Sequence, residues 1–229
     1  MEENGRDSGE SLVLVKICGI TRRADAYAAV DAGAAAIGFV FWPESPRFID
    51  PYRARTIAAG LPPFVTTVGV FVDQPSDHVS RVASLVRLSA VQLHGSETPD
   101  YAAALGRPVI KAVTLGEPPG EGPEEDGEAI SLWPNHVAVL LDVRDPVKHG
   151  GTGQVIDWNR AAAVAARRPV LLAGGLTPEN VAAAIRCVRP FGIDVSSGVE
   201  ESPGVKDHGR VRALFKAIEV IHADTCFES

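Results

Sequence analysis

The prediction of the fold starts from Lys16-Ile17-Cys18-Gly19-Ile20-Thr21, a short junction between two different kinds of sequence. Residues 12–15 before it read Leu-Val-Leu-Val, which is too short for a helix and β-branched enough for a buried strand. Residues 24–30 after it are rich in alanine and predict a helix, for which Thr21 is a candidate N-cap. Cys18 therefore lies where a strand ends, and it is either a reactive thiol or one more small buried side chain.

The composition of the whole chain narrows the class of protein. The chain has 229 residues, of which 45% are hydrophobic, and this is enough for one sizeable domain. Its net charge of -7 argues against nucleic acid or an acidic membrane surface as the main partner. Its three cysteines have no close spacing, so they indicate neither a disulfide framework nor a zinc ribbon and are typical of the reducing cytoplasm.

Three segments are predicted along the chain. Residues 1–11 are polar and acidic, lack the pattern of a signal peptide and are expected to form a disordered N-terminal tail. Residues 12–222 are expected to form a single folded domain, and residues 223–229 a C-terminal tail. No apolar run approaches the roughly 20 residues that a membrane-spanning helix needs, so no membrane partner is expected.

Strand-like and helix-like stretches alternate along this domain. The strand-like stretches are short and apolar, and they cover residues 12–17, 35–41, 65–72, 90–93, 109–113, 137–141, 170–172 and 193–196. The helix-like stretches are rich in alanine, and they cover residues 24–32, 52–59, 78–88, 100–105, 158–166, 179–187 and 211–221. A capping side chain before a proline marks three helix starts, at Asp50, Thr98 and Thr177, and Asp207 is expected to cap the last helix.

This alternation predicts a parallel sheet, which can be an open doubly wound sheet or a closed (β/α)8 barrel. No G-x-G-x-x-G follows the first strand, where a dinucleotide-binding open sheet needs it. A set of eight strand–helix units in 229 residues, against a typical length of about 250, favours the barrel. Residues 117–128 are rich in Pro, Gly and Glu and predict a solvated loop, with a short helix near 129–132.

Most of the unusual polar residues fall at or just after the carboxyl ends of the predicted strands. In a closed barrel these ends meet at one mouth, where active sites lie, whereas chance would scatter such residues over both ends. Each residue also has a structural explanation, since Asp73 can cap a helix and His94 can be a hydrogen-bonded rim histidine. The set as a whole predicts a ligand site and comprises Cys18, Arg47, Asp73, His94, Asp142, Gly174, Gly175, Ser196, Ser197 and Gly198.

Glycine marks the last three strand ends, in Gly150-Gly151-Thr152-Gly153, Gly174-Gly175 and Ser197-Gly198. Glycine permits positive φ and close backbone approach, so that neighbouring N–H groups can point at one anion. In barrels of this class the loops after strands seven and eight commonly bind phosphate. The sequence therefore predicts a phosphate site there, with a short helix opening at Ser197.

Short motifs occur in order at the functional strand ends. They are Lys16-Ile17-Cys18-Gly19-Ile20-Thr21, Ser45-Pro46-Arg47, Val91-Gln92-Leu93-His94-Gly95, Leu140-Leu141-Asp142, Gly150-Gly151-Thr152-Gly153, Leu172-Ala173-Gly174-Gly175-Leu176, Asp194-Val195-Ser196-Ser197-Gly198-Val199-Glu200 and Pro203-Gly204-Val205-Lys206-Asp207. This pattern resembles the phosphoribosylanthranilate isomerase family, with Gln154 as a departure where a lysine is common. The resemblance implies a single TIM barrel without metal or other cofactor. It also implies conversion of N-(5′-phosphoribosyl)anthranilate to the 1-deoxyribulose phosphate by an Amadori rearrangement, in tryptophan biosynthesis.

The same resemblance assigns roles to residues of this chain. Cys18 is the general base and needs thiolate character, which Lys16 nearby can support, and Asp142 is the general acid and must hold a proton near neutral pH. Arg47 suits the anthranilate carboxylate, because a guanidinium can grip it bidentately. Lys16 and His94 are further substrate contacts, and the phosphate-binding residues are Gly153, Gly174, Gly175, Ser196, Ser197 and Gly198.

The implied partner is a small-molecule substrate, and the chain is expected to be a monomer or a homodimer in the cytoplasm. Two other functions stay open from the residues alone. One is another phosphate-binding barrel isomerase or epimerase, although the related histidine-pathway isomerase uses two aspartates where this chain has a cysteine after its first strand. The other is a non-catalytic barrel that binds a phosphorylated sugar, against which the presence of both Cys18 and Asp142 argues.

Overall fold

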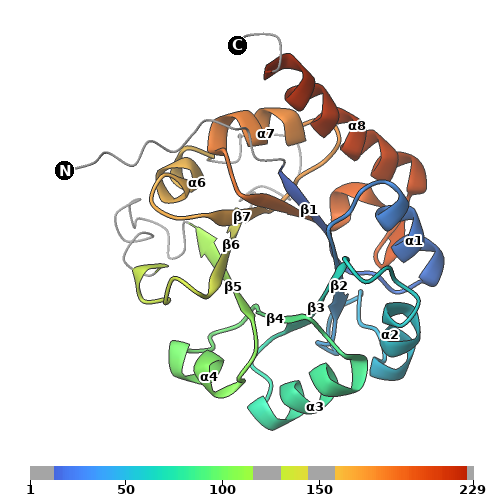
Figure 1. Cartoon of the computed structure of the whole chain (residues 1–229), viewed down its shortest axis with the longest axis vertical. Coiled ribbons are helices and arrows are strands. Elements are labelled where there is room, and N and C mark those ends of the chain that lie inside the picture. Colours follow the sequence, from blue (N-terminus) through green and yellow to red (C-terminus); the bar gives the residue numbers. More distant parts are fainter. Residues whose placement is uncertain (1–12, 116–129, 144–157, 226–229) are drawn as a thin grey trace.

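The strands of this protein close into one parallel barrel. The computed structural model describes residues 13–115, 130–143 and 158–225. Within these residues eight strands pair in sequence order and the eighth returns to the first (Figure 1). They are β1 (Leu14–Ile17), β2 (Ala36–Val40), β3 (Thr66–Phe71), β4 (Ala90–Leu93), β5 (Val109–Leu115), β6 (Ala138–Val143), β7 (Val170–Ala173) and β8 (Gly192–Val195).

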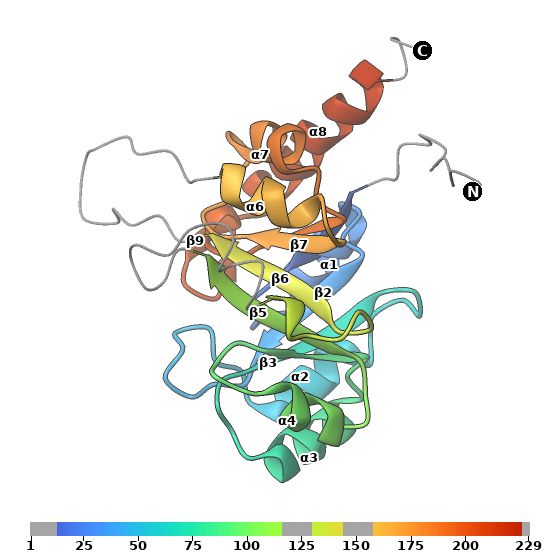
Figure 2. The same ribbon diagram turned by 90° about the vertical axis from the view of Figure 1, so that its left-hand side faces the viewer.

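Helices surround the ring of strands and cover its outer face, as Figures 1 and 2 show. They are α1 (Arg23–Asp31), α2 (Pro51–Ala58), α3 (Ser76–Val86), α4 (Pro99–Ala104), α6 (Trp158–Ala165), α7 (Val181–Val188) and α8 (His208–Thr225). After β8 the chain forms a 3₁₀ turn, η1 (Ser197–Val199), and a small antiparallel pair, β9 (Glu200–Ser202) with β10 (Val205–Lys206). None of the helices in the described ranges is both long and apolar enough to cross a lipid bilayer.

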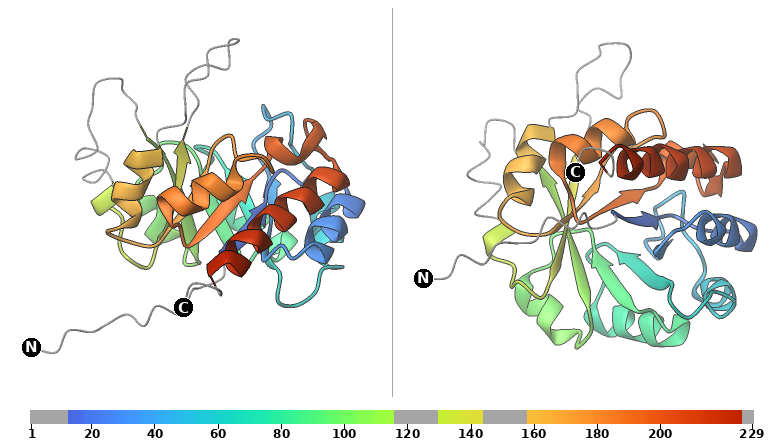
Figure 3. Two further views of the ribbon diagram at one scale, coloured as in Figure 1. Left: turned by 90° about the horizontal axis from the view of Figure 1, so that it is seen from above. Right: turned by 45° about the horizontal axis from the view of Figure 1, so that its top comes forward.

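The closure between the first and last strands is continuous. Residues Leu14 to Ile17 of β1 pair in register with Gly192 to Val195 of β8. Outside this seam α8 packs beside α1, which Figure 3 shows in both of its views. The two ends of the described chain therefore hold each other in place.

Two apolar layers stabilise the barrel. The larger layer lies between strands and helices, where side chains such as Phe39, Leu141 and Leu172 are fully buried. The smaller layer lies inside the ring and comprises Val68, Ala90, Ile110, Ala112, Leu140 and Ala173. Since successive strand residues point to opposite faces, strands such as β6 and β7 contribute to both layers, whereas β1 and β8 place Lys16 and Asp194 inside the ring.

The predicted barrel is confirmed, and every predicted strand overlaps an observed one. The largest differences are at strand ends: β1 starts at Leu14 instead of residue 12, β5 ends at Leu115 instead of residue 113, and β6 ends at Val143 instead of residue 141. Helix α8 continues to Thr225, beyond residue 221, where the predicted helix ends, and into the segment predicted as a C-terminal tail. The predicted segments 1–11 and 117–128 lie outside the described residues, whereas residues 130–131 of the expected short helix are helical.

Most of the predicted helix caps are confirmed. Asp50 accepts hydrogen bonds from the first backbone N–H groups of α2, and Thr98 and Asp207 do the same for α4 and α8. The prediction for Thr21 is wrong, because its hydroxyl donates to the Gly204 carbonyl oxygen instead. Thr177 opens a turn that precedes α7, and this helix starts only at Val181.

A buried carboxylate, Asp25 of α1, joins the start of the chain to its end. It accepts hydrogen bonds from the Arg22 guanidinium, the Lys206 backbone N–H and the His208 ring. Burial raises the pKa of Asp25, but these hydrogen bonds outweigh burial and hold the pKa below its ordinary value of 3.8. A lowered folded-state pKa means that Asp25 stabilises the fold above about pH 4 and that this contribution is lost on acidification.

Asp25→Asn is therefore expected to lower the free energy of unfolding by about 2 kcal/mol at pH 7, because charge-assisted hydrogen bonds are lost. The difference between parent and variant should shrink as the pH falls from about 4 toward the lowered folded-state pKa, because the unfolded carboxylate takes up a proton before the folded one does. Urea unfolding at pH 7 and at pH 3.5 measures both effects. Asp77→Asn is the control, since Asp77 is exposed and pairs only with Arg81 within α3. A constant parent–variant difference across this pH range would contradict the assigned role of Asp25.

Candidate active site

A cavity of about 710 Å³ opens at the carboxyl ends of the barrel strands. Its lining comes from strands far apart in the sequence, which the closed ring brings together. Nine of the residues predicted for the site line this one cavity: Cys18, Arg47, His94, Asp142, Gly174, Gly175, Ser196, Ser197 and Gly198. The residues that the sequence predicted for a ligand site therefore lie together around one cavity at the carboxyl ends of the strands.

Three predicted residues lie elsewhere. Lys16 is buried beneath the cavity, and its ammonium group bonds to Gln92 and Asp194 instead of facing the opening. Asp73 holds the loop after β4, since its carboxylate accepts hydrogen bonds from the N–H and hydroxyl of Ser96. Gly153 lies outside the described residues.

The thiol of Cys18 sits directly after β1 in a close-packed position. A side chain at Gly38 on β2 would come within 2.8 Å of its sulfur, so the missing side chain there makes room for the thiol. Burial raises the pKa of Cys18 and the nearby Asp194 adds to this, while Lys16 and Lys206 act in the opposite direction. The thiol form therefore prevails at neutral pH. Forming the thiolate that the sequence predicted requires free energy, and the positive charges of Lys16 and Lys206 reduce the amount required.

The carboxyl group of Asp142 enters the cavity from β6, on another part of the ring. One of its oxygens lies 3.4 Å from Nε2 of His94, which follows β4. Both side chains are about a quarter to a third exposed, at 24% and 35%, so a ligand in the cavity can reach them. The site therefore presents a thiol and a carboxyl group from two different directions to one bound molecule.

Arg47 is held at the cavity by a carboxylate. Its Nε and Nη2 atoms donate to Glu200, at distances between 2.6 and 3.1 Å. Lys206 donates to the same carboxylate at 2.8 Å and to the Ser196 carbonyl oxygen at 3.1 Å. Burial raises the pKa of Glu200, but the two cations outweigh it and keep the carboxylate ionised. Glu200 therefore binds the Nε and Nη2 atoms of the Arg47 guanidinium, and the Nη1 atom can donate to a further acceptor.

The loops after β7 and β8 form the glycine-rich side of the cavity. Gly174 and Gly175 have φ of 89° and 61°, values that side chains other than glycine rarely adopt. A side chain at Gly198 would collide with the Leu176 carbonyl, so these two loops pack backbone against backbone. The helix predicted to open at Ser197 is only the 3₁₀ turn η1, because Glu200 already begins β9.

Several site residues were missed by the sequence reasoning, and for some of them a signal was present. Side chains two positions apart on a strand point to the same face, so the residue two before each strand-end residue also faces the barrel interior. Lys16, which was predicted as a substrate contact, stands two before Cys18, and the two missed residues, Gln92 and Asp194, stand two before His94 and Ser196. Gly38, Glu200 and Lys206 carry no such signal, because only the tertiary fold brings them next to the cavity residues Cys18, Arg47 and Ser196.

These features define a class of protein. The fold is a parallel (β/α)8 barrel, and the cavity at its active end carries a thiol, a carboxyl group, a guanidinium and glycine-rich backbone. The thiol of Cys18 and the carboxyl group of Asp142, which can take up and release protons, line the same cavity. The described residues contain no cluster of three or more His, Cys, Asp or Glu that could hold a metal ion. The class is that of TIM-barrel enzymes with an acid–base site.

Residues 15–217 match the model of the N-(5′-phosphoribosyl)anthranilate isomerase family, and the chain belongs to this family. It is 46% identical to N-(5′-phosphoribosyl)anthranilate isomerase of Pelobacter propionicus. The matched region of 205 residues covers 90% of this chain and 95% of that relative.

Two solved structures of the family are also similar to this chain. One is phosphoribosylanthranilate isomerase in complex with reduced 1-(o-carboxyphenylamino)-1-deoxyribulose 5-phosphate, at 42% identity and a TM-score of 0.79, covering 91% of this chain and 99% of the other. The other is a monomeric form generated from the dimeric enzyme of Thermotoga maritima, at 40% identity and a TM-score of 0.78, with the same shares covered.

Proposed function

We propose that this protein converts N-(5′-phosphoribosyl)anthranilate to 1-(2-carboxyphenylamino)-1-deoxyribulose 5-phosphate, an Amadori rearrangement in tryptophan biosynthesis. Family membership supports this reaction, and a product-like ligand is bound in a relative of the same fold. The observation that carries the proposal is the pair of Cys18 and Asp142, which line one cavity from β1 and β6. An aldose-to-ketose rearrangement needs one acid and one base, and this pair can supply both.

The first chemical step opens the sugar ring. Asp142 in its protonated form donates a proton to the furanose oxygen, and the bond from C1′ to this oxygen breaks. The nitrogen lone pair of the anthranilate forms the C=N bond of a Schiff base, so charge and electrons balance. Asp142 leaves this step as a carboxylate, beside the ring of His94.

The second step moves a proton from carbon. Cys18 as thiolate takes the C2′ proton, and the electron pair of that bond forms the C=C bond of an enolamine while the Schiff base becomes an amine. Tautomerisation of the enol then gives the ketone. The positive charge of Lys16 and Lys206 near Cys18 favours the thiolate that this step requires.

The two ends of the substrate fit the two ends of the cavity. The backbone of Gly174, Gly175 and Gly198, together with Ser197, is available to a phosphate on the side of β7 and β8. The free edge of Arg47 is available to the anthranilate carboxylate on the side of β2. Between these ends the sugar would lie next to Cys18 and Asp142.

The decisive experiment is turnover of N-(5′-phosphoribosyl)anthranilate, followed by the loss of anthranilate fluorescence as product forms. The proposal expects saturable turnover without added metal or cofactor. Turnover of another phosphorylated sugar in its place would favour a different barrel isomerase or epimerase. Binding without any turnover would favour the non-catalytic alternative, and either result would overturn the proposal.

Arg47→Ala is expected to weaken substrate binding. KM should rise by a factor that corresponds to about 2 kcal/mol or more, because a charged hydrogen bond to the carboxylate is lost. Substrate analogues without this carboxylate should bind the variant and the parent equally. Arg81→Ala is the matched control, since Arg81 is an exposed arginine of α3 that pairs with Asp77 of the same helix. A variant that still discriminates these analogues as the parent does would show that Arg47 is not the carboxylate contact.

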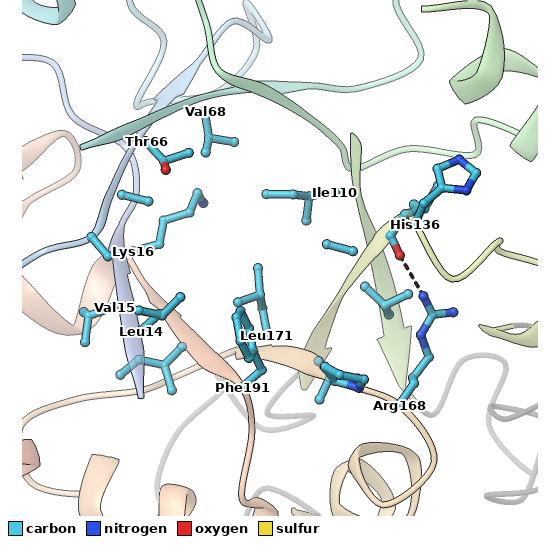
Figure 4. Close-up of a pocket in the computed structure, with 18 of the residues that line it drawn as sticks. Leu14, Val15, Lys16, Thr66, Val68, Ile110, His136, Arg168, Leu171 and Phe191 are labelled. Carbon is cyan, nitrogen blue, oxygen red and sulfur yellow. Dashed lines mark hydrogen bonds between the residues drawn. The ribbon is translucent and has the colours of Figure 1, made fainter. Parts of the chain in front are cut away.

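The opposite end of the barrel carries features of an interface. A second cavity of about 630 Å³ lies there, among the first residues of the strands (Figure 4). Its lining is mostly apolar and includes Leu14 and Phe191, which are 42% and 51% exposed. At the rim Arg168 is not free, because it donates to backbone carbonyl oxygens such as that of Val137. An apolar cavity with exposed apolar residues at its edge can receive an apolar side chain of another protein.

A protruding aromatic residue lies at the same end. The loop between α2 and β3 extends beyond the barrel in Figure 2, and its last residues carry Phe64 with 97% of the side chain exposed. Since a relative is a dimeric enzyme, we propose that this protein is a homodimer in which Phe64 of each copy enters the second cavity of the other. Burial of one phenylalanine contributes about 1.5–3 kcal/mol, and the symmetric contact forms twice.

Phe64→Asp is expected to convert the dimer to a monomer, because the charge cannot enter an apolar cavity. Sedimentation velocity or light scattering measures the mass of parent and variant at the same concentration. Tyr52→Asp is the control, since Tyr52 is 67% exposed on the first turn of α2, at the other end of the barrel. A parent that is monomeric, or a Phe64→Asp variant that stays dimeric, would contradict this interface.

A further inference from the structure

A chain of polar side chains crosses the inside of the barrel beneath the active-site cavity. Lys16 on β1 donates to Oε1 of Gln92 on β4 at 3.0 Å, and to Asp194 on β8 at 2.9 Å. Nε2 of Gln92 lies 3.0 Å from Nδ1 of His94. Nε2 of His94 in turn lies 3.4 Å from Asp142. One continuous path therefore links the strand that carries Cys18 to the carboxyl group of Asp142.

The direction of every hydrogen bond in this chain is set by Lys16. Burial lowers the pKa of Lys16, but the attraction of Asp194 and the contact with Cys18 outweigh burial, so that the pKa is raised and the side chain is an ammonium group. An ammonium group can only donate, so the amide oxygen of Gln92 must face it. The amide nitrogen of Gln92 then faces His94, and this nitrogen can also only donate.

The consequence for His94 is a fixed tautomer. Nδ1 receives the amide N–H of Gln92, so it must carry a lone pair, and the ring proton lies on Nε2, which faces Asp142. A doubly protonated ring would set an N–H group on Nδ1 against the N–H groups of Gln92. Gln92 is 1% exposed, and its amide oxygen accepts a hydrogen bond from Lys16. If the amide group turned away from His94, the buried Lys16 ammonium would lose this acceptor.

The charge of His94 matters for the group next to it. An imidazolium beside Asp142 would favour the carboxylate form by direct attraction, and a carboxylate has no proton to give. A neutral ring exerts much less attraction on the carboxylate. The other ionisable side chains that line the same cavity are Cys18, Arg47 and Asp194, and in the described residues none of them is bonded to His94.

We propose that Gln92 is a positioning residue, which keeps His94 neutral with its proton on Nε2 so that Asp142 can hold the proton it donates. The role of Asp142 in this statement rests on the proposed function, whereas the state of His94 does not. Among the described residues, the side chain of Gln92 bonds to Lys16 and to the ring of His94, and it has no hydrogen bond to the thiol of Cys18 or to the carboxyl group of Asp142.

The state of His94 can be measured directly in the unliganded protein. Nitrogen-15 NMR distinguishes ring nitrogens that carry a proton from those that carry a lone pair, and the spectrum of His94→Asn assigns the signals of His94. The parent at pH 7 should show the proton on Nε2 and a lone pair on Nδ1. Gln92→Glu offers Nδ1 an acceptor, so both ring nitrogens should be protonated. Gln92→Met removes the donor without adding charge, so both neutral tautomers should be populated.

Kinetics then test the consequence for catalysis. Gln92→Glu should lower kcat by tenfold or more with little change in KM, because the residues at the two ends of the substrate are untouched. In the His94→Asn background the same substitution should change kcat less than twofold, since asparagine cannot become a cation. A merely structural role for Gln92 would instead give equal losses in both backgrounds.

Each arm can overturn the inference separately. A parent with its proton on Nδ1, or a Gln92→Glu variant with an unchanged ring, would overturn the tautomer assignment. The expected ring states combined with an unchanged kcat would overturn the positioning role. If the parent showed no turnover at all, the proposed function would fail, and the NMR spectra would still decide the state of His94.

Discussion

Replacing Cys18 with alanine is expected to lower kcat by roughly 10²–10⁴, the usual scale for the loss of a general base. KM should change far less, because the phosphate and carboxylate contacts lie on other residues of the cavity. Steady-state kinetics with N-(5′-phosphoribosyl)anthranilate measure both constants. The control is a chain with Cys187→Ala and Cys226→Ala, which should keep the parent kcat. A Cys18→Ala enzyme that turns over at close to the parent rate would refute the proposed mechanism.

The raised pKa of Cys18 gives a second test on the same control chain. Thiolate is the form that iodoacetamide attacks, so alkylation of Cys18 should be slow at neutral pH and accelerate as the pH rises above the ordinary thiol value of about 8.5. Because Cys18 lines the cavity, bound substrate should protect it, and alkylation should abolish turnover. Alkylation that proceeds without loss of activity would also exclude Cys18 as the base.

Asp142→Asn is expected to cause a loss in kcat of similar size, roughly 10²–10⁴, because an amide cannot donate a proton to the furanose oxygen. Asparagine keeps the size of the side chain and its neighbour His94, so KM should again change little. The control is Asp73→Asn, since Asp73 also follows a barrel strand but serves the loop that carries Ser96. The double variant with Cys18→Ala should lose less than the product of the two single losses. A large rise in KM with an unchanged kcat would assign Asp142 to binding instead of catalysis.

The barrel could be predicted from the sequence because each of its units is local. A buried strand, a turn and an alanine-rich helix are all recognisable within about 25 residues, and caps such as Asp50 lie next to the N–H groups that they bind. The prediction for Thr21 failed because its partner, the Gly204 carbonyl, lies 183 residues further along the chain. Helix α8 ends at Thr225, whereas the predicted helix ends at residue 221. The residues between these two ends include neither glycine nor proline, so the sequence does not interrupt the helix there.

The mouth of the site could be predicted in part for the same reason. Cys18 and His94 follow strand ends, Asp142 is the penultimate residue of β6, and strand ends are local features. The second layer was predicted only in part, because Lys16 was expected to contact substrate, whereas its ion pair with Asp194 exists only once the ring pairs β1 with β8. The proposed role of Gln92 depends on three strands at once. Interactions that only the closed ring creates cannot be inferred from one stretch of sequence at a time.

The pairing of β1 with β8 also sets when this protein becomes functional during its synthesis. Lys16 and Asp194 lie 178 residues apart, so a ribosome releases nearly the whole chain before the ion pair can form. Until then β1 lacks its second neighbour in the sheet, the Lys16 ammonium lacks its counter-ion, and the open strand edge can pair with other chains. The active site is completed only with the last strand. A chain that stops before residue 192 leaves the ring open and lacks the side of the cavity that β8 and η1 provide.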